Sequence, residues 1–352
     1  MTPLILHPQG TPTCPRATPR QLYIAWVPFQ RRAVAMEADF GYALHHIGVS
    51  FRSRVLRPLE YLLKAWQTLA LLLRDRPQVL WIQMPPAPLL YLAFVYRQLF
   101  QQDLKIIADC HNATFRRPWI EFPGVIWLFN RCEGVVVHNP FVEEQALALG
   151  IEAAVLRVLR DRTLTPTPAT LSAATTSTSE RVADPRPWVL VPCSFNADEP
   201  IAELFQAARL APDLTFVLTG NTRRAQGRHC LDDLPKNIRL AGFVPEAEFN
   251  ALLASADAVV GLTKLEGIQL SVANEALSYG QPMVLSNTKL LQAFFPQGAV
   301  YVDPLDGAAI AQGCYTAIAN AESLRRSVVA LRQAVEAQWQ QQAEPIHRLL
   351  ES

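Results

Sequence analysis

The chain has 352 residues, of which 50% are hydrophobic and 18% are charged. This composition excludes a disordered or fibrous chain, and the length is sufficient for two domains with a core each. The net charge of +1 is unevenly placed, because residues 1–160 hold 17 Lys and Arg against 11 Asp and Glu, whereas residues 161–352 hold 15 against 20. The excess of basic residues in the first half indicates either chance scatter between two domains or a first domain that faces an anionic surface such as phospholipid.

The cysteines and the apolar runs bear on the cellular compartment. The six cysteines are widely spaced and contain no C-x-x-C pair, so neither a disulfide framework nor a zinc site is predicted. The most apolar run, Ala87–Phe100, is interrupted by Arg97 and is too short to span a bilayer, and the N-terminus lacks an apolar core of the signal-peptide type. We therefore expect a cytoplasmic protein, soluble or held peripherally at the cytoplasmic face of the membrane.

In the first half of the chain, apolar runs alternate with amphipathic stretches, as in parallel strands joined by crossover helices. One predicted helix, from residue 58, mixes leucines and Trp66 with basic residues. It could lie on an anionic membrane or could face the core with its cations reaching solvent. The predicted strands are Leu22–Val27, Val79–Gln83, Lys105–Ala108 and Gly134–Val137, and the predicted helices include Pro58–Arg74 and Pro140–Leu149.

Residues 163–187 are rich in Thr, Ser, Ala and Pro, which is typical of a flexible linker or surface loop. The alternation then restarts, and the last fifty residues read as helical. Open parallel sheets bind ligands at the carboxyl ends of their strands, so we expect two α/β domains with a cleft between them. The predicted strands are Trp188–Pro192, Thr215–Thr219, Ile238–Phe243, Ala258–Leu262, Met283–Leu285 and Ala299–Val302, and the helices are Ala202–Leu210, Glu246–Ser255 and Leu270–Tyr279.

The segment Thr263–Asn287, TKLEGIQLSVANEALSYGQPMVLSN, carries the clearest chemical signal. A helix N-terminus offers unpaired N–H groups to a phosphate, and carboxylates accept strong hydrogen bonds from sugar hydroxyls. Nine helical steps of about 100° would turn Glu266 and Glu275 to opposite faces, so Glu266 must precede the helix if both are to contact one ligand. The segment therefore predicts a nucleotide-sugar site.

This order of residues resembles the C-terminal signature of the retaining, GT-B-fold glycosyltransferases of the group-one (glycosyltransferase family 4-like) type. The similarity continues through Asn237–Gly267 and Gly298–Pro304 and covers most of the second domain. One departure is that eight residues separate the two glutamates, where the family usually has seven. The matching positions are Glu266, Gly267, Ile268, Leu270, Glu275, Ala276, Leu277, Gly280, Pro282, Met283 and Val284.

Upstream, Val189–Pro200 lacks the Arg and Lys with which most relatives hold the donor diphosphate. This string is similar to the version in the chitobiosyldiphosphodolichol beta-mannosyltransferase subgroup, as are Leu80–Leu90, Ile106–Asn112 and Val158–Arg162. That subgroup inverts the anomeric centre, so the stereochemical outcome stays open. Arg223, Arg224 and Lys264 are candidates to replace the missing cations, and solvated surface charge is the alternative for each arginine.

The resemblance implies roles for individual residues. Glu266 and His111 are the catalytic candidates, with Glu266 on the sugar hydroxyls and His111 close to the donor sugar. Asp109 could orient that histidine, although His111 could also be a loop residue that only binds backbone. Glu275 would bind the ribose, and the diphosphate would lie over the helix N-terminus. The donor-binding set is Glu275, Gly267, Ile268, Gln269, Leu270, Ser271, Gly220, Asn221, Lys264 and Ser194.

The leading hypothesis is a GT-B glycosyltransferase that moves a hexose from a UDP- or GDP-sugar to a hydroxyl of a glycan or lipid-linked acceptor. We expect no cofactor and no metal, since there is no D-x-D string, and no nucleic-acid partner. The alternatives are a catalytically inactive GT-B module that binds sugar nucleotide or a partner enzyme, and an epimerase or phosphorylase on the same fold. The expected parts are residues 1–162 (acceptor side), 163–187 (linker or surface loop), 188–330 (donor side) and 331–352 (a C-terminal helix packing back toward the first domain).

Overall fold

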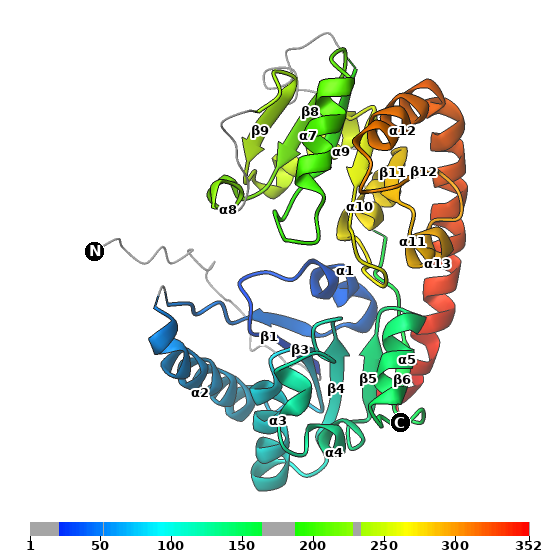
Figure 1. Cartoon of the computed structure of the whole chain (residues 1–352). Coiled ribbons are helices and arrows are strands. Elements are labelled where there is room, and N and C mark those ends of the chain that lie inside the picture. The colour runs from blue at the N-terminus through cyan, green and yellow to red at the C-terminus, as the bar shows by residue number, and fades with distance from the viewer. Residues whose placement is uncertain (1–20, 52, 164–186, 228–233, 352) are drawn as a thin grey trace, which may run out of the picture. The chain divides into compact units, whose positions relative to one another are not determined.

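The computed structural model of the chain describes residues 21–51, 53–163, 187–227 and 234–351. Its contacts divide the chain into two compact units (Figure 1). The first unit is Met1–Val136 with Ile151–Leu156, and the second is Val137–Gly150 with Arg157–Ser352. The second unit is therefore assembled from two separate stretches of sequence. The predicted linker, residues 163–187, lies outside the described residues except at its two ends.

The first sheet has six strands in the order β2-β1-β3-β4-β5-β6. β1 runs parallel to β2 and β3, and β3 runs parallel to β4. All six residues of β3 are buried, as expected for a central parallel strand whose two faces are covered. The strands are β1 (Gln21–Ala25), β2 (Ala43–His46), β3 (Val79–Met84), β4 (Lys105–Cys110), β5 (Gly134–Val137) and β6 (Leu156–Val158).

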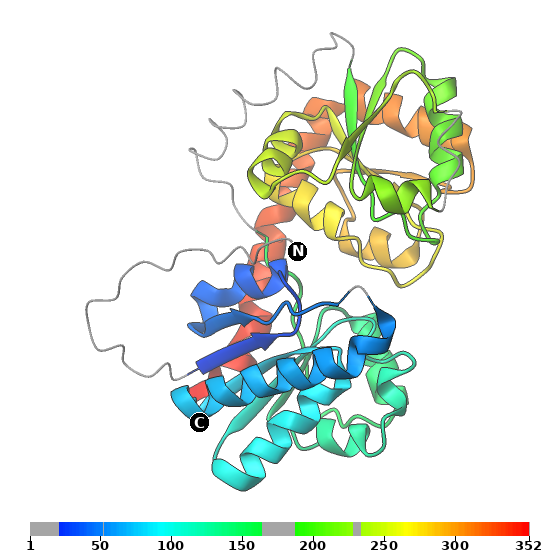
Figure 2. The same cartoon turned by 90° about the vertical axis from the view of Figure 1, so that its left-hand side faces the viewer.

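The first half of the chain contains several elements that the sequence analysis did not assign, among them α1 and β2. The helix α1 and the edge strand β2 are short, and β2 has no β-branched residue, so its local signal is weak. The apolar run at residues 87–100 is a helix, and it contacts its neighbour α2 (Figures 1 and 2). The helices are α1 (Arg31–Phe40), α2 (Arg57–Asp75), α3 (Ala87–Phe100), α4 (Val125–Phe129) and α5 (Pro140–Ala148), with short 3₁₀ turns η1 (Arg54–Leu56) and η2 (Trp119–Glu121).

The second sheet has the order β12-β11-β10-β7-β8-β9, with all neighbouring strands parallel. From the central pair β7 and β10, the chain proceeds outward in opposite directions. The predicted strands of this half are confirmed within one or two residues. They are β7 (Trp188–Pro192), β8 (Thr215–Thr219), β9 (Ile238–Gly242), β10 (Ala258–Gly261), β11 (Met283–Ser286) and β12 (Ala299–Val302).

Helices cover both faces of the second sheet and bury two apolar clusters. One cluster includes residues of α7 and α12, and the other includes residues of α9, α10 and α13. Within the described residues, no helix is both long and apolar enough to cross a membrane. The helices are α7 (Ile201–Leu210), α8 (Thr222–Gln226), α9 (Glu246–Ser255), α10 (Ser271–Tyr279), α11 (Lys289–Phe294), α12 (Gly307–Ala319) and α13 (Ala321–Glu351).

Candidate functional site

The carboxyl edge of the second sheet collects most of the predicted donor-binding residues. From β7 the next strands are added toward one edge of the sheet, and from β10 they are added toward the other edge. Open parallel sheets bind ligands at the point where the strand order reverses in this way. Three loops lie at the carboxyl ends of strands near this point, and they follow β7, β8 and β10. Their residues are 193–200, 220–221 and 262–270.

The loop after β10 is fixed to its neighbours by hydrogen bonds. The Thr263 N–H donates to Ser286 Oγ at 2.8 Å, and the Thr263 hydroxyl donates to Asp198 Oδ2 at 3.2 Å. The Lys264 N–H donates to the Asp198 carbonyl at 2.7 Å. Since Thr263 is fully buried, these bonds hold the loop against both the β7 loop and β11.

Glu266 and Gly267 form the turn before α10. Gly267 has φ +73°, and a Cβ added there would lie 2.5 Å from Cε1 of Phe141 in α5, so only glycine fits this turn without strain. Glu266 is exposed, and its Oε2 accepts a hydrogen bond from the Lys289 N–H at 3.2 Å. The expectation that Glu266 precedes the helix is confirmed.

The start of α10 is suited to bind an anion. Its N-cap residue, Leu270, makes no side-chain capping bond, and the first turn contains no acidic residue. The Ala273 N–H donates to the Leu270 carbonyl, so the N–H groups of Ser271 and Val272 and the positive end of the helix dipole are the groups suited to bind a phosphate. Ser271 is exposed and Glu275 is half-buried. Because Glu275 lies four positions after Ser271, the two side chains project from the same side of the helix.

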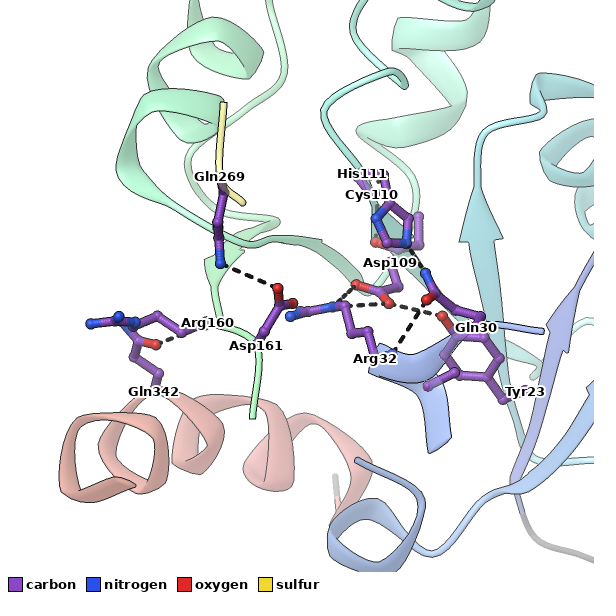
Figure 3. A network of polar contacts seen from close by, with 12 residues as sticks. Tyr23, Gln30, Arg32, Asp109, Cys110, His111, Arg160, Asp161, Gln269 and Gln342 are labelled. Carbon is purple, nitrogen blue, oxygen red and sulfur yellow. Dashed lines mark hydrogen bonds and ion pairs between the residues drawn. The ribbon is translucent and has the colours of Figure 1, made fainter. Parts of the chain in front are cut away.

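A polar chain that the sequence analysis missed supports this helix start (Figure 3). Asp161 Oδ2 accepts hydrogen bonds from Gln269 Nε2 and from Asn274 Nδ2, both at 3.2 Å. Asn139 Nδ2 donates to Gln269 Oε1 at 3.3 Å. These bonds orient Gln269, which lies just before α10. They join residues more than 100 positions apart, so no local pattern could reveal them.

The loop after β7 carries a carboxylate where most members of the resembled family carry cations. Glu199 accepts hydrogen bonds from the N–H groups of Ser194 at 2.9 Å and Phe195 at 2.8 Å. Burial raises the pKa of Glu199, and these backbone N–H groups act in the opposite direction. In this conformation the Ser194 N–H is bound to Glu199, while the exposed Ser194 side chain lies at the edge of the sheet.

Arg224 reaches the same loop from α8. Its guanidinium donates to the Ser194 carbonyl at 3.1 Å and to Asn196 Oδ1 at 3.2 Å. Lys264 has its Nζ 3.8 Å from Glu203 Oε2. Arg224 thus contacts the β7 loop, the Lys264 side chain lies near α7, and Arg223 is exposed on the short helix α8.

Gly220 and Asn221 shape the loop after β8. A Cβ at Gly220, whose φ is +128°, would lie 2.0 Å from the carbonyl oxygen of Cys193. The backbone of β8 can therefore approach the β7 loop only with glycine at this position. The Asn221 side chain accepts hydrogen bonds from the N–H groups of Arg223 and Arg224, so its visible role is to cap α8.

In the first unit, polar side chains gather where β1 and β4 end (Figure 3). The fully buried Asp109 accepts hydrogen bonds from the Tyr23 hydroxyl at 2.8 Å and from Arg32 Nε at 3.0 Å. Burial and the nearby Asp109 charge raise the pKa of Tyr23, which keeps its hydroxyl protonated as a donor. The His111 N–H donates to the Met84 carbonyl at 3.0 Å, which anchors the backbone of the histidine.

Gln30 connects the two histidines of this cluster. Its side-chain amide is hydrogen-bonded to His111 Nε2, and its backbone N–H donates to His46 Nε2 at 3.1 Å. Burial lowers the pKa of His46, in agreement with a neutral ring that accepts this bond. The sequence analysis did not select Gln30 or His46, because β2 and the start of α1 were not assigned.

Most of the second sheet, from the loop after β7 onward, is similar to that of a known family. Residues 196–320 match the model of the family described as Glycosyl transferases group 1. No curated protein matches the chain. The matched segment contains the β8, β9 and β10 loops and all of α10, so this part of the chain is similar to a group 1 glycosyltransferase domain.

Solved structures support the whole architecture. Sucrose-phosphate synthase from Thermosynechococcus elongatus is 15% identical, with 94% of this chain and 98% of that chain covered at a TM-score of 0.68. Anabaena HepE in complex with UDP-glucose is 13% identical (93% and 99%, TM-score 0.66). The UDP-forming α,α-trehalose-phosphate synthase from Burkholderia vietnamiensis is 14% identical (95% and 100%, TM-score 0.66). At these identities the likeness concerns the fold, and the predicted GT-B class with two parallel six-stranded sheets is confirmed.

Proposed function

We propose that this glycosyltransferase moves a hexose from a nucleotide-sugar donor, a UDP- or GDP-sugar, to a hydroxyl of a glycan or lipid-linked acceptor. The observation that carries the proposal is the uncapped N-terminus of α10, with Ser271 and Glu275 on one side of the helix, inside the segment matched by the family model. UDP-sugars are the first donors to test, because a similar structure, that of HepE, holds UDP-glucose.

In this proposal the N–H groups at Ile268–Ser271 bind the donor diphosphate. Charge grows on that group as the sugar bond breaks, and fixed N–H donors that stabilise it can lower the barrier by several kcal/mol. Glu275 binds the ribose hydroxyls and Glu266 the sugar hydroxyls. Arg224 and Lys264 supply the positive charge that Val189–Pro200 lacks.

His111 is the proposed second catalytic residue. Its backbone is held by the Met84 carbonyl and its ring by Gln30, so the imidazole has a defined position at the end of β4. We propose that it lies close to the donor sugar. We also propose that its unit binds the acceptor.

Several finer features belong to the same proposal. The transfer is proposed to need neither metal nor cofactor, and activity that survives chelation by EDTA is the expected result. The resembled family retains the anomeric centre and the beta-mannosyltransferase subgroup inverts it, so both outcomes stay open here, and NMR of the product anomer distinguishes them. A cytoplasmic location is proposed from the cysteine spacing.

Substitution of Glu275 and of Glu266 should affect donor affinity and turnover separately. Glu275→Ala should weaken donor affinity at least about 10-fold through the loss of charge-assisted hydrogen bonds, measured by calorimetric titration with UDP-sugars. Glu266→Ala should mainly lower kcat. Glu344→Ala, at an exposed glutamate on α13, is the matched control. Unchanged donor affinity in Glu275→Ala would contradict its assignment.

One observation favours a second candidate, an inactive module that binds sugar nucleotide or a partner enzyme. The Glu199 carboxylate occupies the N–H groups of Ser194 and Phe195, and a negative charge there repels a diphosphate. Donor hydrolysis or transfer by the purified protein would eliminate this candidate. Donor binding without turnover, across a panel of acceptors, would support it.

A further inference from the structure

The helix α2 presents apolar side chains to solvent. Leu62 and Trp66 are 66% and 68% exposed, and Leu59 and Leu73 are also exposed. Spacings of three, four and seven residues place these four side chains along one side of the helix. We call them the α2 stripe. Figure 2 shows α2 as the long light-blue helix of the first unit.

The buried side of α2 is, unusually, rich in polar groups. The buried residues of the helix are Lys64, Thr68, Leu72 and Asp75. Lys64 Nζ donates to the Trp26 carbonyl at 3.2 Å, and Trp26 Nε1 donates to Thr68 Oγ1 at 2.9 Å. Polar bonds therefore help to hold the helix to its unit, while the large apolar side chains of the α2 stripe are exposed. An ordinary surface helix directs its apolar stripe toward the core instead.

The surroundings of the stripe are positively charged. Along the helix itself, Arg57, Lys64, Arg74 and Arg76 stand against two carboxylates. Both carboxylates are paired within the helix, Glu60 with Lys64 at 2.7 Å and Asp75 with Arg74 at 2.6 Å. Arg57 and Arg76 are exposed at the two ends of the helix. The exposed charges of the helix that have no carboxylate partner within it are therefore cationic and stand at its two ends.

From this geometry we infer that the α2 stripe docks on the surface of an anionic lipid bilayer, with α2 lying along the membrane plane. Leucine and tryptophan side chains partition into the boundary between headgroups and acyl chains, while arginines bind anionic headgroups. A second copy of the chain fits this surface less well, because it would bring two cationic helices together. The inference concerns attachment and does not depend on the transfer reaction.

Vesicle flotation tests the inference with the full-length protein. We expect binding to vesicles of equal parts phosphatidylglycerol and phosphatidylcholine, little binding to phosphatidylcholine alone, and a loss of binding when salt is raised from about 50 to about 500 mM. Leu62→Ser and Trp66→Ser should each lower the partition coefficient at least about 10-fold, because each removes one large apolar side chain from the boundary. Arg57→Gln should lower it on anionic vesicles only.

Leu305→Ser is the matched control, since Leu305 is 61% exposed but lies in the second unit. Circular dichroism and the thermal midpoint verify that each variant is folded. Equal binding by Leu62→Ser and Leu305→Ser would overturn the inference, as would equal binding to neutral and anionic vesicles. A wild-type dimer that Leu62→Ser dissociates, without vesicle binding, would assign the stripe to a second copy and would also overturn it.

Discussion

Gly267 is constrained in two separable ways, by its φ of +73° and by the Phe141 ring, which would lie 2.5 Å from an added Cβ. Gly242 has nearly the same φ, +75°, but nothing lies within 4 Å of where its Cβ would be. Gly242→Ala therefore measures the cost of the backbone conformation alone, about 1 kcal/mol. Gly267→Ala adds the clash.

We predict that Gly267→Ala destabilises the protein by about 1–3 kcal/mol more than Gly242→Ala does, because overpacking costs this much in a closed environment. Urea unfolding measures both. Adding Phe141→Ala to Gly267→Ala should recover part of the difference in a double-mutant cycle. Identical free energies of unfolding for the two alanine variants would show that the ring moves aside without cost.

His46 should make stability depend on pH. Burial lowers its pKa, so between the folded value and the usual value of about 6.5 the unfolded state binds more protons than the folded state. The His46 contribution is therefore complete above about pH 6.5 and is lost as the pH falls below it. The fall in thermal midpoint between pH 7.5 and 5.5 should be smaller in His46→Gln than in the wild type.

His45→Gln is the control, because His45 is the neighbouring residue of the same strand. If His46→Gln and His45→Gln change the pH dependence equally, the burial of His46 is not its source. A thermal midpoint that falls with pH as steeply in His46→Gln as in the wild type would contradict the prediction.

The sequence predicted the position of a residue well where that position follows from the spacing of nearby residues. The spacing of Glu266 and Glu275 was enough to place Glu266 before the helix, as found. Asp161 and Arg32 could not be understood in this way, because their partners lie 108 and 77 residues away, respectively. Which distant polar groups meet is decided by the folded sheet.

At the scale of elements, α13 is attached to the segment around Arg160. Trp339 Nε1 donates to the Arg160 carbonyl at 3.1 Å, and the Arg160 guanidinium stacks on Phe294 at 4.3 Å. The guanidinium also donates to Gln338 Oε1 at 3.1 Å and to the Phe294 carbonyl at 3.3 Å. Burial lowers the pKa of Arg160 to about 10, so it remains charged at neutral pH.

Trp339 is fully buried in this contact. We predict that Trp339→Ala costs about 3–5 kcal/mol of unfolding free energy through the cavity it leaves. Trp339→Phe should cost less, since it keeps most of the ring and loses the hydrogen bond, worth about 1 kcal/mol. Chemical denaturation distinguishes the two. Equal losses would mean that the hydrogen bond, and not the buried volume, dominates.

Elements were predicted best where apolar runs are long and bounded by turns. The strands β7 and β8 were predicted to the residue, because Val, Leu and Phe runs with clear ends have few alternatives. The edge strand β2, with the sequence ALHH, was missed because it pairs only with β1 and is stabilised by that pairing. The sequence also could not predict which side of α2 is exposed, since its pattern permits either side to be buried.

At the scale of the whole molecule, the second unit is not a continuous piece of chain. It includes Val137–Gly150 and Arg157–Ser352, so a fragment that begins at residue 187 lacks α5 and the Arg160 segment. We predict that fragment 187–352 has a thermal midpoint lower than that of fragment 137–352, or does not fold. Differential scanning fluorimetry of the two fragments is the measurement, and equal midpoints would contradict the prediction.

The discontinuity of the second unit restricts how such a chain can recombine. The composition of residues 163–187 suggests a natural crossover point for exchanging donor specificity between homologous genes. A crossover there would separate Arg160 from Trp339, Asp161 from Gln269, and Phe141 from Gly267. A working chimaera must instead inherit residues 137–150 and 157–163 from the same parent as its C-terminal half. Under the proposed function, inheritance of donor preference is therefore tied to a part of the gene that lies upstream of the apparent domain boundary.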